Sequence, residues 1–333
     1  MRERFGAFVA EREPHALALS LAAWAEACVR PPEDRDAPAI DALRGPLRES
    51  LRKRLARPAP PGLAETSPGV DVAQRLARAT SDLLDDADGF LRREAIAASL
   101  TPAERREILR GMVLTRALDN RLKALFTGSE VQYRGVGFQG KGFRSLGQEA
   151  IYAAPLRLRR GPTHRGPDGA WRGDVIAPLI RDLGAVLCMR PDAETVRMVL
   201  SAQMGKAGPP MDGRDLHVGD FGWGILPAAA PLGLSSLTIA GIAMAFARQG
   251  SDRVAVSFIG EGGASLGEWH EAVNLCAARR LPAVFCVQNN QTALSTPVAD
   301  QSAVRVFADK AAGYGLPGIT IDGTDPEATA AAF

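Results

Sequence analysis

Two stretches decide the fold of this chain: VAVSFIGEGG at residues 254–263 and PAVFCVQNNQT at residues 282–292. The first five or six residues of each are apolar and rich in β-branched or aromatic side chains, which predicts buried strands over 254–259 and 283–287. A helical pattern over residues 266–278 separates them, so the strands are expected to run parallel. Parallel strands bring their carboxyl ends to one edge of the sheet, where open α/β sheets bind ligands.

The residues that follow these strands predict a metal-bound diphosphate at that edge. Glu261 leaves the first strand and Asn290 leaves the second, so a carboxylate oxygen and an amide oxygen can meet one cation. Mg²⁺ prefers oxygen ligands and usually completes its shell with phosphates and water. Gly260, Gly262 and Gly263 allow the backbone to approach a diphosphate, and the next helix can offer its N-terminal N–H groups.

The same stretch resembles a known cofactor motif. Residues 260–297, GEGGASLGEWHEAVNLCAARRLPAVFCVQNNQTALSTP, are similar to the thiamine diphosphate motif of the α subunits of 2-oxo acid dehydrogenase E1 components. The resemblance implies thiamine diphosphate and Mg²⁺ as cofactors, with Glu261, Asn290 and the main-chain carbonyl of Thr292 as metal ligands. Many thiamine enzymes have Asp at the position of Glu261, whereas the branched-chain type resembles this chain in having Glu.

The resemblance extends over residues 101–333. SLGQEA at residues 145–150 is similar to the family's S-x-G-Q-E-A segment, and GILPAAAPLG at residues 224–233 is similar to the loop that holds the aminopyrimidine ring. That second match implies three ring contacts: Leu226, Ala230 and Leu232.

Arg181 resembles an arginine that binds the diphosphate, although Ile180 stands where the family usually has tyrosine. A surface ion pair is the alternative role for Arg181. His217 lies in a glycine-rich loop and is the candidate catalytic residue, with a structural hydrogen bond as the alternative. For His270, within a helical pattern, we expect a structural role.

The implied function is that of an E1 α component. Such a component takes part in oxidative decarboxylation of a 2-oxo acid and in transfer of the acyl group to a lipoyl-bearing E2 partner. It acts only with an E1 β part, separate or fused, which supplies the glutamate that activates the pyrimidine ring. A transketolase-like thiamine enzyme and an assembly or regulatory homologue without turnover remain as alternatives. No residue identifies which 2-oxo acid is used.

Two other glycine motifs point to different functions but are incomplete. GVGFQGK at residues 135–141 satisfies most of a nucleotide-binding Walker A pattern, but Gly142 replaces the Ser or Thr that would hold Mg²⁺. GEGG at residues 260–263 also begins like a dinucleotide fingerprint, but Ser265 stands where the third glycine should be.

The composition is that of an ordinary soluble globular protein. The 333 residues are 46% hydrophobic and 23% charged, and the net charge of +2 gives no case for nucleic-acid binding. Four cysteines in apolar surroundings, without C-x-x-C spacing, favour a reducing cytoplasm. Residues 226–247 carry no charge and approach membrane-spanning length, but Pro227 and Pro231 favour a loop that enters a buried helix.

The chain divides near residue 100. Residues 1–100 are rich in Ala, Arg and Leu, and helical spacing recurs at 43–55 and 72–84, which predicts a helical N-terminal extension. Residues 101–333 alternate between helical and strand patterns, which predicts an α/β domain with a parallel sheet and helices on both faces. The other elements expected there are helices at 101–125, 146–158 and from Asp192, a helix ending near Ala247, and strands at 174–177 and 318–321. Because the chain stops inside a helical pattern that begins at Thr324, the domain is expected to be incomplete at Phe333.

Overall fold

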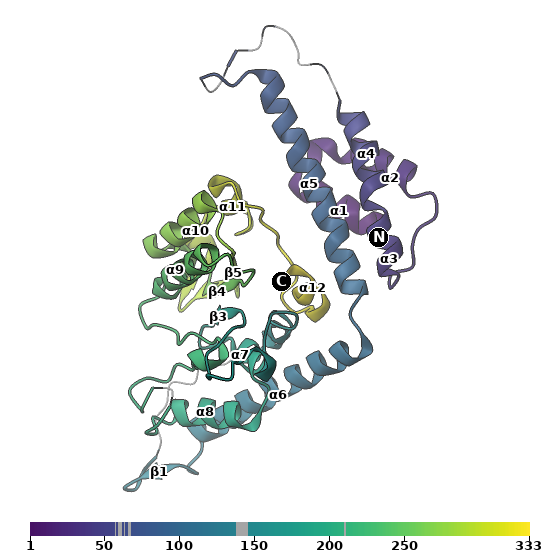
Figure 1. Cartoon of the computed structure of the whole chain (residues 1–333). Coiled ribbons are helices and arrows are strands. Elements are labelled where there is room, and N and C mark those ends of the chain that lie inside the picture. Colours follow the sequence, from purple (N-terminus) through teal and green to yellow (C-terminus); the bar gives the residue numbers. More distant parts are fainter. Residues whose placement is uncertain (57, 59–61, 63, 66–67, 138–145, 210) are drawn as a thin grey trace. The chain divides into compact units, whose positions relative to one another are not determined.

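A computed structural model describes the chain apart from residues 57, 59–61, 63, 66–67, 138–145 and 210 (Figure 1). It forms two compact units, Met1–Thr101 and Pro102–Phe333. Most of the Walker-like segment and Ser145 of the SLGQEA segment lie outside the described residues.

The first unit is helical, as predicted from its sequence spacing. Its core gathers side chains from every helix, including Phe5, Trp24, Ile40, Leu51 and Leu91. An Asp71 cap, whose carboxylate accepts from the Gln74 N–H at 2.8 Å, begins the longest helix, which runs well past the predicted end at residue 84. The helices are α1 Arg2–Arg12, α2 Leu17–Ala27, α3 Ala37–Ala42, α4 Arg44–Leu55 and α5 Val72–Ala98, with a 3₁₀ turn at Pro14–Ala16.

The second unit is built around three parallel strands in the order β3, β4, β5 (Figure 1). They are Val175–Ala177, Ala255–Gly260 and Ala283–Gln288. The pairing of β4 with β5 runs from Ala255 opposite Ala283 to Gly260 opposite Gln288. The parallel sheet predicted from the two apolar runs is therefore confirmed.

Helices cover both faces of this sheet because alternate strand residues point to opposite sides. Val175, Ala177 and Ala255 belong to the core cluster formed with α9. Ile176, Val256 and Phe258 belong to the cluster formed with α7. The helices of this unit are α6 Pro102–Thr127, α7 Leu183–Met189, α8 Ala193–Gln203, α9 Leu234–Arg248, α10 Gly267–Arg279, α11 Asp309–Tyr314 and α12 Pro326–Ala332.

Short elements complete the unit. Two antiparallel hairpins pair β1 Gln132–Tyr133 with β2 Val136–Gly137 and β6 Thr292–Ala293 with β7 Thr296–Pro297. Single 3₁₀ turns lie at Glu149–Ala153, Pro162–His164, Phe221–Trp223, Gly263–Ser265 and Val298–Asp300.

Two predicted elements are wrong. The helix expected over 146–158 is only the 3₁₀ turn Glu149–Ala153 followed by turns, because Pro155 has no N–H to continue a helical ladder. Residues 318–321 form no strand: they follow Pro317, and Gly318 packs so closely on α11 that a side chain there would overlap the carbonyl of Ala308. The alternation of only two apolar residues, Ile319 and Ile321, is too short to predict a paired strand.

The uncharged run at residues 226–247 is a loop that leads into helix α9, as its prolines predicted. The burial expected for this helix is only partly right, because one face is buried and the other is exposed. Over the residues that the structure describes, no helix combines the length and apolar character needed to cross a membrane.

Candidate functional site

The register of the sheet places the two motif segments at one edge. Gly260 and Gln288 are the last pair between β4 and β5, so Glu261 and Asn289 are the first residues beyond the ladder on neighbouring strands. Asn290 follows immediately. Both segments therefore leave the sheet at its carboxyl edge, where a ligand can meet them together.

Glu261 is buried, with 1% of its surface exposed. Its Oε2 lies 3.8 Å from Nη2 of Arg181, and its Oε1 is a buried oxygen without a hydrogen-bond partner among the described residues. A buried carboxylate oxygen without a partner is costly, and a cation is the kind of ligand that satisfies it. The donor set at this edge therefore fits a divalent cation.

Arg181 comes from the turn between β3 and α7. Besides the Glu261 contact, its Nη2 donates to the main-chain carbonyl of Gln288 at 3.3 Å. A side chain at Gly260 would overlap this guanidinium, so Arg181 would have to move away from its present contacts. The arginine thus bridges the ends of β4 and β5, and its alternative role as a surface ion pair does not fit its contacts.

The glycines after β4 also touch the other predicted segments. A Cβ at Gly262 would lie 2.5 Å from Cβ of Ala293, so this loop packs against the β6–β7 hairpin that carries Thr292. A Cβ at Gly263 would lie 4.0 Å from Cβ of Leu232, in the loop that resembles the aminopyrimidine site. The glycine loop is therefore the point where these segments converge.

The arm that carries Asn290 and Thr292 is exposed. The Asn290 side-chain oxygen accepts from the Thr292 N–H at 3.1 Å, and the Asn289 side-chain oxygen accepts from the Gln291 N–H at 2.9 Å. Thr292 faces Pro297 as a non-hydrogen-bonded pair, and the neighbouring bond runs from the Val298 N–H to the Gln291 carbonyl at 3.0 Å. Among the described residues, the hydrogen bonds of Asn290 stay within its own arm and none joins Glu261 to it.

The predicted ring contacts differ in position. The N–H of Leu226 donates to the carbonyl of Ile176 at 2.9 Å, which fixes the start of the loop beside β3. Leu232 lies near Gly263 and is 51% exposed. Ala230 is exposed.

Two residues of this edge were missed from the sequence: Asp182 and Gln288. Asp182 is fully buried; its Oδ2 accepts from the Leu179 N–H at 2.6 Å and its Oδ1 accepts from the Gln288 side-chain amide. Burial raises the pKa of Asp182 to about 6, against the lowering effect of these two hydrogen bonds. Two sequence features could have indicated them: Asp182 directly follows Arg181, and Gln288 is the polar residue that ends an apolar strand.

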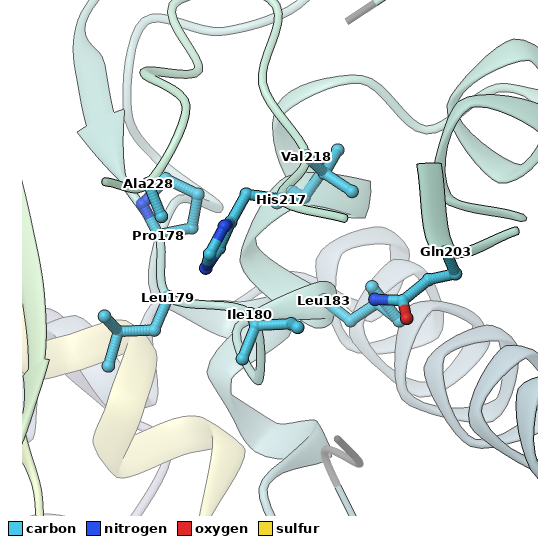
Figure 2. A pocket seen from close by; sticks show the side chains of 9 residues that line it. Pro178, Leu179, Ile180, Leu183, Gln203, His217, Val218 and Ala228 are labelled. Atoms are coloured by element: carbon cyan, nitrogen blue, oxygen red, sulfur yellow. The ribbon is translucent and has the colours of Figure 1, made fainter. Parts of the chain in front are cut away.

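His217 lines a small pocket with Pro178, Leu179, Ile180, Leu183, Val186, Gln203, Val218 and Ala228 (Figure 2). Its Nδ1 lies 2.7 Å from Oδ1 of Asp215. His270, by contrast, contacts the hydroxyl of Tyr314 through Nδ1. The structural role expected for His270 agrees with this contact.

Within the described ranges, no group of three or more His, Cys, Asp or Glu side chains is placed to hold a metal ion. The predicted metal ligands at the sheet edge are of a different kind: the Glu261 carboxylate, the Asn290 side-chain oxygen and the Thr292 main-chain carbonyl.

The parallel sheet with helices on both faces defines an α/β protein whose candidate site lies at the carboxyl edge. Residues 169–333 match the family model described as dehydrogenase E1 component. The family resemblance drawn from residues 260–297 is confirmed. This family match implies thiamine diphosphate as cofactor.

Similar proteins are α subunits of 2-oxo acid dehydrogenases. The chain is 30% identical over 233 residues to the 2-oxoisovalerate dehydrogenase subunit alpha of Bacillus subtilis, covering 69% of this chain and 64% of that protein. It is 32% identical over 247 residues to the pyruvate dehydrogenase E1 component subunit alpha of the same organism, covering 72% and 57%. Over 99 residues, 30% of this chain and 27% of the relative, it is 48% identical to the 3-methyl-2-oxobutanoate dehydrogenase subunit alpha of Mycobacterium tuberculosis. The chain thus spans less than two thirds of the length of these relatives.

Proposed function

We propose that this chain is the α component of a 2-oxo acid dehydrogenase, which decarboxylates a 2-oxo acid oxidatively and transfers the acyl group to a lipoyl-bearing E2 partner. The observation that carries the proposal is the buried Glu261 carboxylate, with one oxygen unpaired, beside Arg181 at the edge of the sheet. The names of the similar α subunits support it. The family match also favours this function over a transketolase-like one.

In this proposal residues 101–333 are the domain that holds the cofactor. Glu261, the Asn290 side chain and the Thr292 carbonyl bind Mg²⁺, an oxygen set that this hard cation accepts. Arg181 neutralises the diphosphate, and Gly260, Gly262 and Gly263 let its oxygens approach the backbone. Leu226, Ala230 and Leu232 contact the ring. When bound, thiamine diphosphate supplies the nucleophilic carbon and the electron sink for decarboxylation.

His217 is the candidate catalytic residue in the same proposal. Its pocket shares Ile180 and Leu179 with the turn that carries Arg181, and Ala228 with the loop that carries Leu226. A substrate at the mouth of this pocket would therefore lie beside the segments that are proposed to hold the cofactor.

The exposed apolar side chains around the glycine loop support a partner at this edge. Leu232, Leu266 and Leu294 are 51%, 36% and 93% exposed. Leucines exposed to this degree beside a functional site are typical of a surface that another chain covers. We assign this surface to the E1 β part, which supplies the activating glutamate. The four cysteines, which form no disulfide, support a cytoplasmic location.

Calorimetry with Mg²⁺ and thiamine diphosphate tests this function. The chain assembled with its β part should bind the cofactor with Mg²⁺ dependence and decarboxylate pyruvate or 2-oxoisovalerate, while the isolated chain should not turn over either acid. Absence of binding heat with the complete assembly would favour the alternative of a non-catalytic assembly homologue. Decarboxylation by the isolated chain would contradict the need for a β part.

A further inference from the structure

Asp215 and His217, two positions apart in the same loop, form a hydrogen-bonded pair. Oδ1 of Asp215 lies 2.7 Å from Nδ1 of His217 and also accepts from the His217 main-chain N–H at 3.2 Å. The two side chains are 28% and 18% exposed. One carboxylate oxygen therefore fixes both the backbone and the ring of the same histidine.

In this pair the Asp215 side chain is the ionised carboxylate. Burial would raise the pKa of Asp215, but the hydrogen bonds from the His217 N–H and ring outweigh it and leave the pKa below its usual range. A carboxylate can only accept, so the ring nitrogen that faces it must carry a proton.

The other edge of the ring faces the pocket. Figure 2 shows the imidazole reaching into the space bordered by Pro178, Leu179 and Ile180. Since Nδ1 is engaged by Asp215, Nε2 is the nitrogen left to meet a ligand. His217 is the one residue of the pocket lining that can carry a charge, and Gln203 is the one other polar side chain of that lining. The enclosed cavity is only about 10 Å³, room for about one water, so a substrate would meet Nε2 at the mouth of the pocket.

We propose that Asp215 is a positioning residue: it holds the proton of neutral His217 on Nδ1, so that Nε2 takes up and releases a proton at the polar end of a small 2-oxo acid at the mouth of this pocket. A histidine whose tautomer is fixed by a carboxylate presents one defined nitrogen to the reacting group. This inference rests on the function proposed above.

The tautomer can be observed directly by nitrogen NMR of the full chain labelled at histidine, which has four such residues. The His217 signals are identified by their loss in His217→Gln. In the native chain, neutral His217 should carry its proton on Nδ1. Asp215→Ala should move at least half of the population to the Nε2 proton form, and Asp215→Asn, which keeps the side-chain size, should produce a mixture. A native proton on Nε2, or an unchanged tautomer in both variants, would overturn the proposal.

Asp212→Asn is the matched control, because Asp212 lies three residues earlier in the same loop and is exposed. Its φ of 53° is one that Asn tolerates. It should change neither the tautomer nor the activity.

Turnover separates this inference from the function on which it rests. In the assembly with the β part, His217→Gln should lower kcat by ~100-fold and Asp215→Ala by ~10-fold, with little change in KM. If the tautomer shifts but kcat does not, the pair is structural and the positioning role is overturned. If native assembly binds no thiamine diphosphate and decarboxylates no 2-oxo acid, the proposed function fails while the NMR result still reports on the pair.

Discussion

The two strands that end at the candidate site differ in burial, and so do the site residues that follow them. Glu261 follows β4, whose residues are almost all buried, and is itself 1% exposed. Asn290 follows the partly exposed β5 and lies on an exposed arm. The buried side is shaped by packing and by the Arg181 contact before any ligand arrives. The exposed side is shaped by short-range hydrogen bonds within the arm, so a ligand or partner must complete it.

Removing the charge on the buried side should have the largest effect. Glu261→Gln keeps the size of the side chain but deletes the carboxylate that is proposed to bind Mg²⁺. Losing one member of a buried charged contact costs about 2–5 kcal/mol, so Mg²⁺-dependent cofactor affinity should fall by ~30- to ~4,000-fold in calorimetry. Glu271→Gln, an exposed glutamate on α10, is the control. Equal affinity in the Glu261 variant would show that this carboxylate is not a ligand.

The next largest effect concerns pH and Asp182. Its pKa in the folded chain, about 6, lies above the value of 3.8 for the unfolded chain, because burial disfavours the charge. The stability that this carboxyl contributes is therefore complete below about pH 4 and is lost as the pH rises through about 6, a difference of ~3 kcal/mol. Denaturant unfolding should show that this loss between pH 4 and 7 is absent in Asp182→Asn.

In that variant the Gln288 amide can turn over, so that its Oε1, a buried oxygen without a partner in the part of the chain that is described, accepts from the new side-chain NH₂ group, while the new side-chain oxygen accepts from the Leu179 N–H. Asp182→Asn should then be at least as stable as the native chain at pH 7. Asp300→Asn, on an exposed turn, is the control and should retain the native pH profile. Parallel profiles for native and Asp182→Asn chains would show that this carboxyl does not set the pH dependence.

Gly260→Ala should have an intermediate effect. The added Cβ would overlap the Arg181 guanidinium and move it away from Glu261 and the Gln288 carbonyl. Overpacking of this kind costs about 1–3 kcal/mol, so cofactor affinity should fall ~10-fold and the thermal midpoint should also decrease. At Gly267 a Cβ would meet nothing within 4 Å, so Gly267→Ala should leave both unchanged or raise stability slightly. A similar loss at both glycines would argue against the Arg181 contact.

The exposed side should give the smallest effect. Asn290→Ala removes one candidate oxygen and one hydrogen bond, worth about 1 kcal/mol, so Mg²⁺-dependent affinity should fall ~5-fold with little change in unfolding. Asn289→Ala removes a comparable hydrogen bond to Gln291 without removing a candidate ligand. If both variants lose affinity equally, the turn geometry matters and not the Asn290 oxygen.

The sequence predicted the elements whose patterns are long or capped. The strands at β4 and β5 and the helix between them were predicted within one or two residues, because each has a regular apolar pattern. The burial predicted for both strands is right for β4 and wrong for β5, whose residues are partly exposed. The predicted helix at residues 146–158 and strand at 318–321 were wrong, because Pro155 and the packing of Gly318 override short apolar patterns.

For the site, the sequence predicted which segments share an edge but not which side chains pair there. The Asp182–Gln288 and Asp215–His217 contacts depend on the path of two loops, and loop paths are set by packing and not by local pattern. The close approach of Arg181 to Gly260 is of the same kind: both residues were candidates, but the reason for the glycine is visible only in space.

Arg181 has a further consequence for how the cofactor is taken up. Its guanidinium is the counterion of Glu261 in the chain by itself, 3.8 Å away and otherwise bonded to a carbonyl. In the function proposed above, loading would be an exchange of partners: the carboxylate would pass from guanidinium to cation, and the guanidinium would pass from carboxylate to diphosphate. Each buried charge would then change partner without losing one, because the Arg181–Glu261 contact keeps both charges paired in the chain by itself.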